Sequence, residues 1–217
     1  GVYESRKEAG RILAREFPVD ADLVIGVPES GIDAAIGYSE ESGIPYEKGI
    51  VKNNYIGRTF IAPGQKSRED KVKIKLNPIA EVAKGKRIVM IDDSIVRGTQ
   101  LRETAEFLFE SGAKEVHARA ACPPILFGCK YLNFSRSNSE MELIARRVIA
   151  EEEGENVDRT VLDDYADPDS DRYHKMVEKI CKRMGFTSLG YNRLDDMLDA
   201  AGIDPSKMCT YCWNGRE

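Results

Sequence analysis

Short apolar runs in this chain are separated by stretches with helical periodicity. The run DLVIGVP at 22–28 is typical of a strand buried on both faces that ends in a loop. Further strands are predicted near 45–51, at 87–91 (RIVMI) and at 116–122. Because helical stretches separate several of these strands, the pattern favours βαβ units and a mainly parallel sheet. Ligands of such sheets bind at the carboxyl ends of the strands.

The helical stretches of the first half have recognisable inner faces. A first helix is predicted around Ile12, Leu13 and Phe17, and a second at 34–38. A third is predicted at 99–111, and Gly112 stands where a helix C-terminal glycine is expected. We expect the inner face of the third helix to carry Leu101, Ala105, Leu108 and Phe109.

Beyond Pro123 and Pro124 the pattern becomes helical. Helices are predicted at 139–151, where Ser139 and Glu142 are spaced as in a capping box, at 171–184 and at 193–201. We therefore expect a core at 1–124, with a lid at 52–76, and a helical appendage with a cysteine-rich end at 125–217.

Composition and charge exclude several classes of protein. The 217 residues carry a formal charge of −5, which argues against general nucleic-acid binding. No apolar run approaches the roughly 20 residues of a membrane span, and no signal peptide is apparent, so we expect a cytoplasmic protein. The start of the chain, directly in a helical pattern, suggests a piece of a larger protein. Residues 51–76 are an exception to the acidic balance, with seven positive and two negative side chains.

The run VMIDDSIVRGTQ contains a candidate phosphate site. It places Asp92 and Asp93 directly after a predicted strand, and Gly98 and Thr99 at the start of a predicted helix. Backbone amides at a helix N-terminus bind anions, and the hydroxyls of Ser94 and Thr99 can donate to phosphate oxygens. The two carboxylates cannot bind phosphate directly, so they should face hydroxyls or a metal ion. A ribose 5-phosphate meets both demands, whereas the competing interpretation is a solvated turn with a chance pair of acids.

This run resembles the signature of the phosphoribosyltransferases that use phosphoribosyl pyrophosphate. With VPESG at 27–31 and KNNYIGRTFIAPGQ at 52–65, the likeness narrows to the C-terminal catalytic domain of the glutamine phosphoribosylpyrophosphate amidotransferases and covers nearly the whole chain. The resemblance implies the type I phosphoribosyltransferase fold, an α/β fold with a mainly parallel sheet flanked by helices. It also implies formation of 5-phosphoribosylamine and pyrophosphate from phosphoribosyl pyrophosphate and ammonia with Mg²⁺, the first committed step of purine synthesis.

The resemblance assigns a role to each matching residue. Asp92 and Asp93 would hold the ribose hydroxyls and Mg²⁺, and Lys52 and Arg58 would reach the pyrophosphate from the lid. These four are the predicted catalytic residues. The remaining substrate-binding residues are Glu29, Ser30 and Gly31 at the pyrophosphate, and Ser94, Ile95, Val96, Arg97, Gly98 and Thr99 at the 5-phosphate.

A cationic lid suits the expected chemistry. The transition state should be oxocarbenium-like, so the two aspartates support the sugar while lid cations and Mg²⁺ support the leaving pyrophosphate. For residues 66–75 the alternative is a solvated basic loop. Tyr55, Phe60 and Ile61 match residues that line an ammonia tunnel in the family, with ordinary loop packing as the alternative. Neutral ammonia needs no strong base, so His117 and His174 are predicted to be structural.

The five cysteines do not suggest a disulfide framework. Cys209 and Cys212 form a C-x-x-C pair, which suits a soft metal or a cluster. Together with Cys129 they resemble three of the four ligands of the [4Fe-4S] cluster in one branch of the family. Cys122 and Cys181 do not match that set. Zinc or free thiols are the alternatives, and the fourth ligand of that branch lies upstream of Gly1.

Two other functions share the phosphate loop. A nucleobase phosphoribosyltransferase would need a base-binding hood, and a non-catalytic regulator that senses phosphoribosyl pyrophosphate would carry a basic winged helix. Family members begin with a glutaminase domain, which this chain lacks, so we expect glutamine-derived ammonia to come from an upstream domain or a separate chain. A homo-oligomer is also expected. Purine nucleotides inhibit the family, and Lys52 and Lys75 match positions near them.

Overall fold

A four-stranded parallel sheet organises the chain. The computed structural model describes residues 1–52, 76–131 and 140–216. The sheet order is β1-β4-β5-β6, with every neighbouring pair parallel, which confirms the prediction of a mainly parallel sheet. A separate antiparallel pair is formed by β2 and β3. The strand bounds are Leu23–Gly26 (β1), Ile50–Lys52 (β2), Leu76–Pro78 (β3), Arg87–Asp92 (β4), Glu115–Ala120 (β5) and Ser188–Tyr191 (β6).

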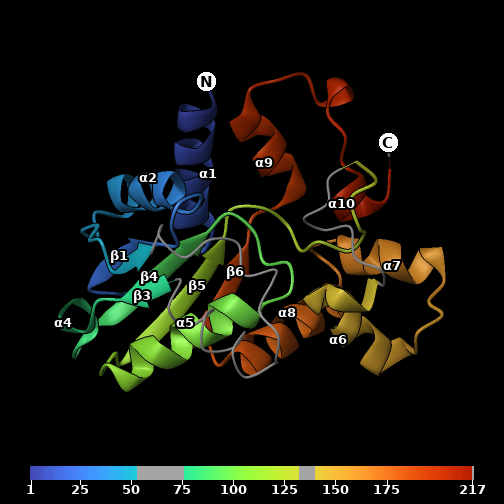
Figure 1. Cartoon of the computed structure of the whole chain (residues 1–217). Coiled ribbons are helices and arrows are strands. Elements are labelled where there is room, and N and C mark those ends of the chain that lie inside the picture. The colour runs from blue at the N-terminus through green and yellow to red at the C-terminus, as the bar shows by residue number, and fades with distance from the viewer. Residues whose placement is uncertain (53–75, 132–139, 217) are drawn as a thin grey trace.

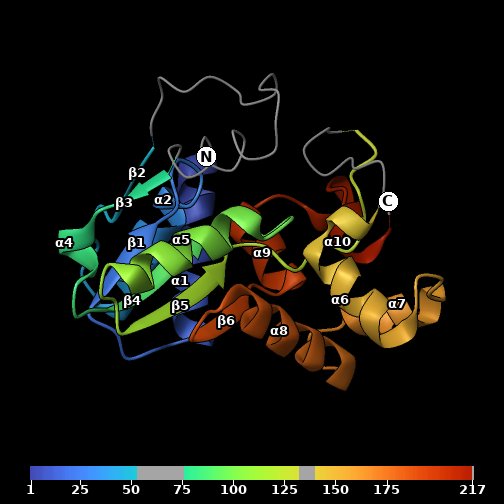
Figure 2. The same cartoon turned by 60° about the horizontal axis from the view of Figure 1, so that its bottom comes forward.

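Helices cover both faces of this sheet (Figure 1). Helices α1, α2 and α9 lie on one face, and α5 and α8 lie on the other. Helices α6, α7 and α10 form a group beyond the β6 edge, as both views show (Figures 1 and 2). The helix bounds are Val2–Glu16 (α1), Ile32–Ser42 (α2), Ala80–Ala83 (α4), Thr99–Glu110 (α5), Ile144–Glu153 (α6), Arg159–Ala166 (α7), Asp171–Met184 (α8), Leu194–Ala201 (α9) and Tyr211–Asn214 (α10), with 3-10 turns at Glu140–Glu142 and Pro205–Lys207.

Strand alternation divides the core into two clusters. Successive side chains of a strand point to opposite faces, so neighbours in sequence join different clusters. In β4, Ile88 and Met90 pack with α5 and α8, whereas Val89 and Ile91 pack with α1 and α2. All four are almost completely buried. A strand that is apolar at every position is therefore what this location between two helical layers requires.

Ion pairs and polar contacts link neighbouring strands near the end of the sheet where β1 and β4 begin. The carboxylate of Asp22, just before β1, accepts hydrogen bonds from the backbone nitrogen of Arg87 at 2.7 Å and from its Nη2 at 3.0 Å. On β5, the buried His117 contacts Ser188 Oγ at 2.7 Å and Glu115 Oε2 at 2.8 Å. The contact with Ser188 links β5 to β6, and the prediction that His117 is structural stays a prediction. Burial lowers the pKa of Arg119, and Nη1 of this side chain donates a hydrogen bond to Ser188 Oγ at 3.0 Å.

The structure corrects three predictions about secondary structure. Phe109 is 36% exposed, because the inner stripe of α5 runs through Leu101, Thr104, Ala105 and Leu108 instead. The helix predicted at 139–151 begins at Ile144, because Glu140–Glu142 forms a separate 3-10 turn; Ser139 lies outside the described residues. The region after Pro124 also contains a strand, β6, which extends the main sheet. The division at residue 124 stays a prediction.

The remaining strand and helix predictions agree with the structure to within a few residues. The predicted strand at 45–51 is regular only from Ile50, while Tyr46 forms an isolated bridge to Val24. The helix at 171–184 has the predicted bounds. Among the described residues, no helix is both long and apolar enough to cross a membrane.

Candidate active site

Two loops meet at the carboxyl ends of β1 and β4. These strands are parallel neighbours, with Gly26 opposite Ile91, so the segments that follow them leave the sheet side by side. The segment after β1 is the predicted pyrophosphate loop, and the one after β4 is the predicted 5-phosphate loop. The structure therefore brings both predicted loops together at the sheet edge where ligands of such folds bind.

The backbone at Gly31 fixes the spacing of the two loops. A Cβ built on Gly31 would lie 2.4 Å from the carbonyl oxygen of Ile91 and 3.0 Å from the Cα of Asp92. The backbone nitrogen of Val27 also donates to the Ile91 carbonyl at 2.8 Å, and the nitrogen of Gly31 donates to the Val27 carbonyl at 2.9 Å. Only glycine fits such a contact, so Gly31 lets the pyrophosphate loop approach the acidic pair. The peptide bond between Pro28 and Glu29 in this loop is cis.

The acidic pair has an unusual electrostatic environment. Asp92 is partly buried at the end of β4, and Asp93 is exposed. Burial, and then the neighbouring charge of Asp93, raises the pKa of Asp92 to about 8, while its Oδ1 accepts a hydrogen bond from the backbone nitrogen of Asp93 at 2.8 Å. An adjacent cation or hydroxyl donors would favour the ionised form of Asp92. The site is thus prepared for a ligand that brings one or both.

The loop from Ser94 to Thr99 leads into the N-terminus of α5. Gly98 caps that helix in the left-handed region, at φ +79°, and a Cβ there would lie 2.7 Å from Sδ of Met184. Ile95 is buried in the core, so one side of the loop is anchored. Thr99 and Gln100, the first residues of α5, are exposed, so the N-terminus of this helix is accessible to an anion.

Helix α6 supports this loop from behind. The backbone nitrogen of Ile144 donates to the Val96 carbonyl at 2.9 Å, and Nη2 of Arg147 donates to the Arg97 carbonyl at 2.7 Å. These two residues were not predicted to act at the site. Their sequence shows only an amphipathic helix, because the partner carbonyls belong to a segment almost fifty positions away.

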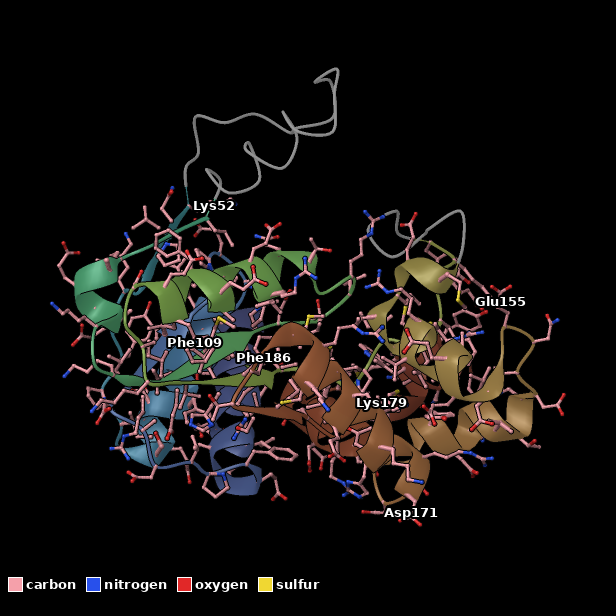
Figure 3. The ribbon with its side chains drawn as sticks, turned by 90° about the horizontal axis from the view of Figure 1, so that it is seen from below. Lys52, Phe109, Glu155, Asp171, Lys179 and Phe186 are labelled. Atoms are coloured by element: carbon pink, nitrogen blue, oxygen red, sulfur yellow. The ribbon has the colours of Figure 1, made fainter. Side chains whose placement is uncertain are left out.

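The predicted lid residues are only partly described. Lys52 is the last residue of β2, opposite Leu76 of β3, and Figure 3 shows it beside that small sheet, far from Asp171. Its contact with pyrophosphate stays a prediction. Arg58 and the predicted tunnel residues Tyr55, Phe60 and Ile61 lie outside the described residues.

Two of the cysteines predicted as cluster ligands, Cys129 and Cys209, lie close enough to the third, Cys212, to affect its pKa. Burial is the largest cause that raises the pKa of Cys212 to about 11, and the neighbouring thiols of Cys129 and Cys209 add to it. The carbonyl of Cys212 accepts hydrogen bonds from the backbone nitrogens of Leu126 and Phe127 at 2.9 and 3.0 Å, so α10 is tied to the segment that carries Cys129. Within the described part of the chain, no three His, Cys, Asp or Glu side chains form a group that could hold a metal ion.

Known proteins resemble the chain in sequence over almost all of its length. No family model matches it. The amidophosphoribosyltransferase of Mycobacterium tuberculosis (strain H37Rv) is 44% identical over 216 residues, which are 99% of this chain and 36% of that protein. The amidophosphoribosyltransferase of Synechocystis is 43% identical, over 99% of this chain and 38% of that protein. The chain corresponds to one segment of the amidophosphoribosyltransferases.

Solved structures agree with this assignment. The glutamine phosphoribosylpyrophosphate amidotransferase of B. subtilis, complexed with ADP and GMP, is 40% identical with a TM-score of 0.76 over the whole chain and 42% of that structure. A structure of "the allosteric regulatory enzyme of purine biosynthesis" is 38% identical with a TM-score of 0.77, over 41% of its own chain. The resemblance and the phosphoribosyltransferase fold predicted from the sequence are confirmed. The chain spans between 36% and 42% of the length of these relatives.

Proposed function

We propose that this chain transfers the phosphoribosyl group of phosphoribosyl pyrophosphate to ammonia, forming 5-phosphoribosylamine and pyrophosphate. One observation carries the proposal. The Asp92–Asp93 pair follows β4, between the loop after β1, which Gly31 allows to come close, and the loop that leads into the N-terminus of α5. The names of the sequence relatives support this reaction rather than transfer to a nucleobase or a purely regulatory role.

Each part of the substrate has a matching group in the site. The amides and hydroxyls from Ser94 to Thr99 would hold the 5-phosphate at the positive end of the α5 dipole. Asp92 and Asp93 would accept hydrogen bonds from the ribose hydroxyls. As the bond to pyrophosphate breaks, positive charge develops on the sugar, and the two carboxylates stabilise it. Neutral ammonia then attacks the anomeric carbon and loses a proton to solvent.

The leaving pyrophosphate would lie against the loop Glu29–Gly31. Backbone amides of that loop can face its oxygens, because Gly31 allows the close approach to β4. Lys52 and Arg58 are proposed to add positive charge from the lid. Cations placed there favour the transition state over the ground state, because the charge on pyrophosphate grows during bond cleavage.

The acidic pair fits a magnesium ion that arrives with the substrate. Mg²⁺ is commonly held by one or two carboxylates together with substrate phosphates, and Asp92 and Asp93 supply two carboxylates. Bound there, Mg²⁺ would neutralise charge on the pyrophosphate. Such a site needs no third protein ligand, because the substrate phosphates and water supply the remaining oxygens.

Further properties are proposed from the amidotransferases. Ammonia would come from a glutaminase domain, and purine nucleotides would inhibit, as supported by the ADP and GMP in the B. subtilis complex. A homo-oligomer is proposed on the same basis. Cys129, Cys209 and Cys212 are proposed as three ligands of a [4Fe-4S] cluster, supported by the nearness of Cys129 and Cys209 to Cys212, which adds to burial in raising the pKa of Cys212. Iron and sulfide content of the purified protein tests the cluster, and a protein with zinc or with free thiols alone would refute it.

Pyrophosphate release with ammonium as the nitrogen source tests the reaction. The chain should release pyrophosphate from phosphoribosyl pyrophosphate at a rate that rises with ammonia concentration. The double variant D92N/D93N should be slower by about 10²–10³, the typical loss when a group that stabilises the transition state is removed. The exposed Glu155→Gln substitution is the matched control and should leave the rate unchanged. A rate independent of ammonia, or an equally active double variant, would refute the proposal.

A further inference from the structure

A cavity of about 280 Å³ beside the phosphate loop is lined mainly by arginines. It lies where the start of α5 meets α6 and the end of α8. Four of its lining residues are arginines, and none is a carboxylate. Its lining consists of Arg97, Thr99, Arg102, Arg147, Arg183 and Met184.

Three helices bring these arginines together. Arg102 stands one turn into α5, Arg147 lies in α6, and Arg183 is in the last turn of α8. Figure 3 shows α8 running from Asp171 at the periphery towards Phe186 beside the sheet, so its last turn reaches the middle of the molecule. Like charges gathered in this way repel one another, and an anion between them would relieve that repulsion.

The carboxylates that pair with these arginines stand outside the cavity. Arg102 pairs with Glu106 at 3.6 Å along its own helix, and Arg183 pairs with Glu151 of α6. Arg97 pairs with a glutamate of the 3-10 turn before α6. The side chains of Arg97, Arg102 and Arg183 are 60%, 46% and 32% exposed. Ion pairs at such exposed positions contribute little free energy. The guanidinium groups therefore retain binding capacity on their cavity side.

Arg147 is the most constrained of the four. Its Nη2 donates to the Arg97 carbonyl at 2.7 Å, while its Nε is buried without a hydrogen-bond partner among the described residues. Burial and the nearby charges of Arg183 and Arg102 lower its pKa. A buried donor without a partner costs free energy, so a movement of the Arg147 side chain that gives its Nε an acceptor would be favoured.

From the cavity, its four guanidinium groups and the buried Nε of Arg147, we infer that this site binds an oligophosphate anion. Guanidinium groups match phosphate oxygens in paired donor geometry, and several of them together select a compact anion of high charge over a monovalent one. The first turn of α5 adds the positive end of a helix dipole at Thr99.

This site is distinct from the proposed 5-phosphate cradle but coupled to it. The cavity shares only Arg97 and Thr99 with the loop, and the other arginines lie on α5, α6 and α8. Arg147 links the two, because it lines the cavity and also holds the Arg97 carbonyl. An anion that draws Arg147 towards itself would change the support of the phosphate loop. The oligophosphate would therefore act on the affinity of the cradle, not on the reacting atoms.

Titration calorimetry with inorganic tripolyphosphate tests this inference on the full chain. Ribose 5-phosphate is kept in excess so that the cradle cannot hold the probe. The variant R102Q/R183Q should bind tripolyphosphate at least ten-fold more weakly than the unchanged chain. The variant R15Q/R172Q removes the same charge from other faces and should stay within two-fold. Equal affinity in both variants, or no binding by the unchanged chain, overturns the inference.

A second arm identifies the source of the phosphate group. If ATP binding is weakened to the same extent by R102Q/R183Q, the cavity accepts the phosphate chain of a nucleotide. If only tripolyphosphate binding is weakened, it accepts the free anion. Both results support an oligophosphate site. The assay needs no turnover, so a chain that fails to release pyrophosphate would refute the proposed reaction and leave this test intact.

Discussion

The contact at Gly31 makes a strong prediction about how the site is spaced. In the substitution Gly31→Ala, the new Cβ would lie 2.4 Å from the Ile91 carbonyl oxygen, whereas such contacts essentially never fall below 3.0 Å. The loop and β4 must therefore separate by at least about 0.6 Å at this point. The obstructing atoms belong to the backbone, so no side-chain rotation can make room.

The expected losses follow from that displacement. The Ile91 carbonyl also accepts the 2.8 Å hydrogen bond from Val27, and moving it by 0.6 Å would stretch that bond beyond the usual 3.2 Å limit. Overpacking of this kind costs about 1–3 kcal/mol of stability. A misplacement approaching 1 Å at a reacting centre reduces a rate by about 10². We therefore expect Gly31→Ala to lower pyrophosphate release by one to two orders of magnitude.

Gly43→Ala is the matched control for this experiment. Gly43 ends α2 at φ +74°, and a Cβ there would meet no atom within 4 Å. Its substitution should cost about 1 kcal/mol through the left-handed backbone alone and leave activity unchanged. Urea unfolding and pyrophosphate release would be measured on both variants. If Gly31→Ala keeps the full rate, or if Gly43→Ala loses as much activity, the argument from close approach is wrong.

Three further predictions concern stability and are measured by urea unfolding. Leu13→Ala, at a fully buried position of α1, should cost about 2–5 kcal/mol, whereas Val2→Ala, 70% exposed, should cost under about 0.5 kcal/mol. Asn192→Ala removes the Nδ2 donations to two carbonyls at 3.0 and 3.1 Å and should cost about 2 kcal/mol; a loss below about 0.5 kcal/mol would show that those carbonyls find other partners. Hydrogen bonds from Arg87 lower the pKa of Asp22 from 3.8 to about 2, so its stabilisation is complete above about pH 4 and is lost as the pH falls towards 2. Asp22→Asn should therefore be less stable than the unchanged chain at pH 6, and the difference should shrink towards pH 2; a constant difference would contradict the assignment.

Runs of consecutive apolar residues were enough to predict two strands of the main sheet. β1 and β4 are apolar at consecutive positions because both of their faces are covered by helices, and this pattern is readable in the sequence. β6 was missed because it has only four residues and its first two are only partly buried at the edge of the sheet. Its place is fixed by contacts from β5 and by the Ser188 hydroxyl, which meets His117 and Arg119. Such partners are more than sixty positions away, so no local pattern signals them.

The site shows the same division between local and distant causes. The predicted residues of the phosphate loop lie within eight consecutive positions, from Asp92 to Thr99. The order strand, acids, turn and helix in this run was enough to predict an anion site. Nothing in that run indicates what stands behind it. The support from Arg147 and the arginine cavity arise only when α5, α6 and α8 pack together, and a single arginine on the polar side of each helix is common on protein surfaces. Sequence reasoning therefore predicts a phosphate site in this loop, whereas the tertiary packing supplies the contacts that support the loop and brings together the arginines of the proposed oligophosphate site.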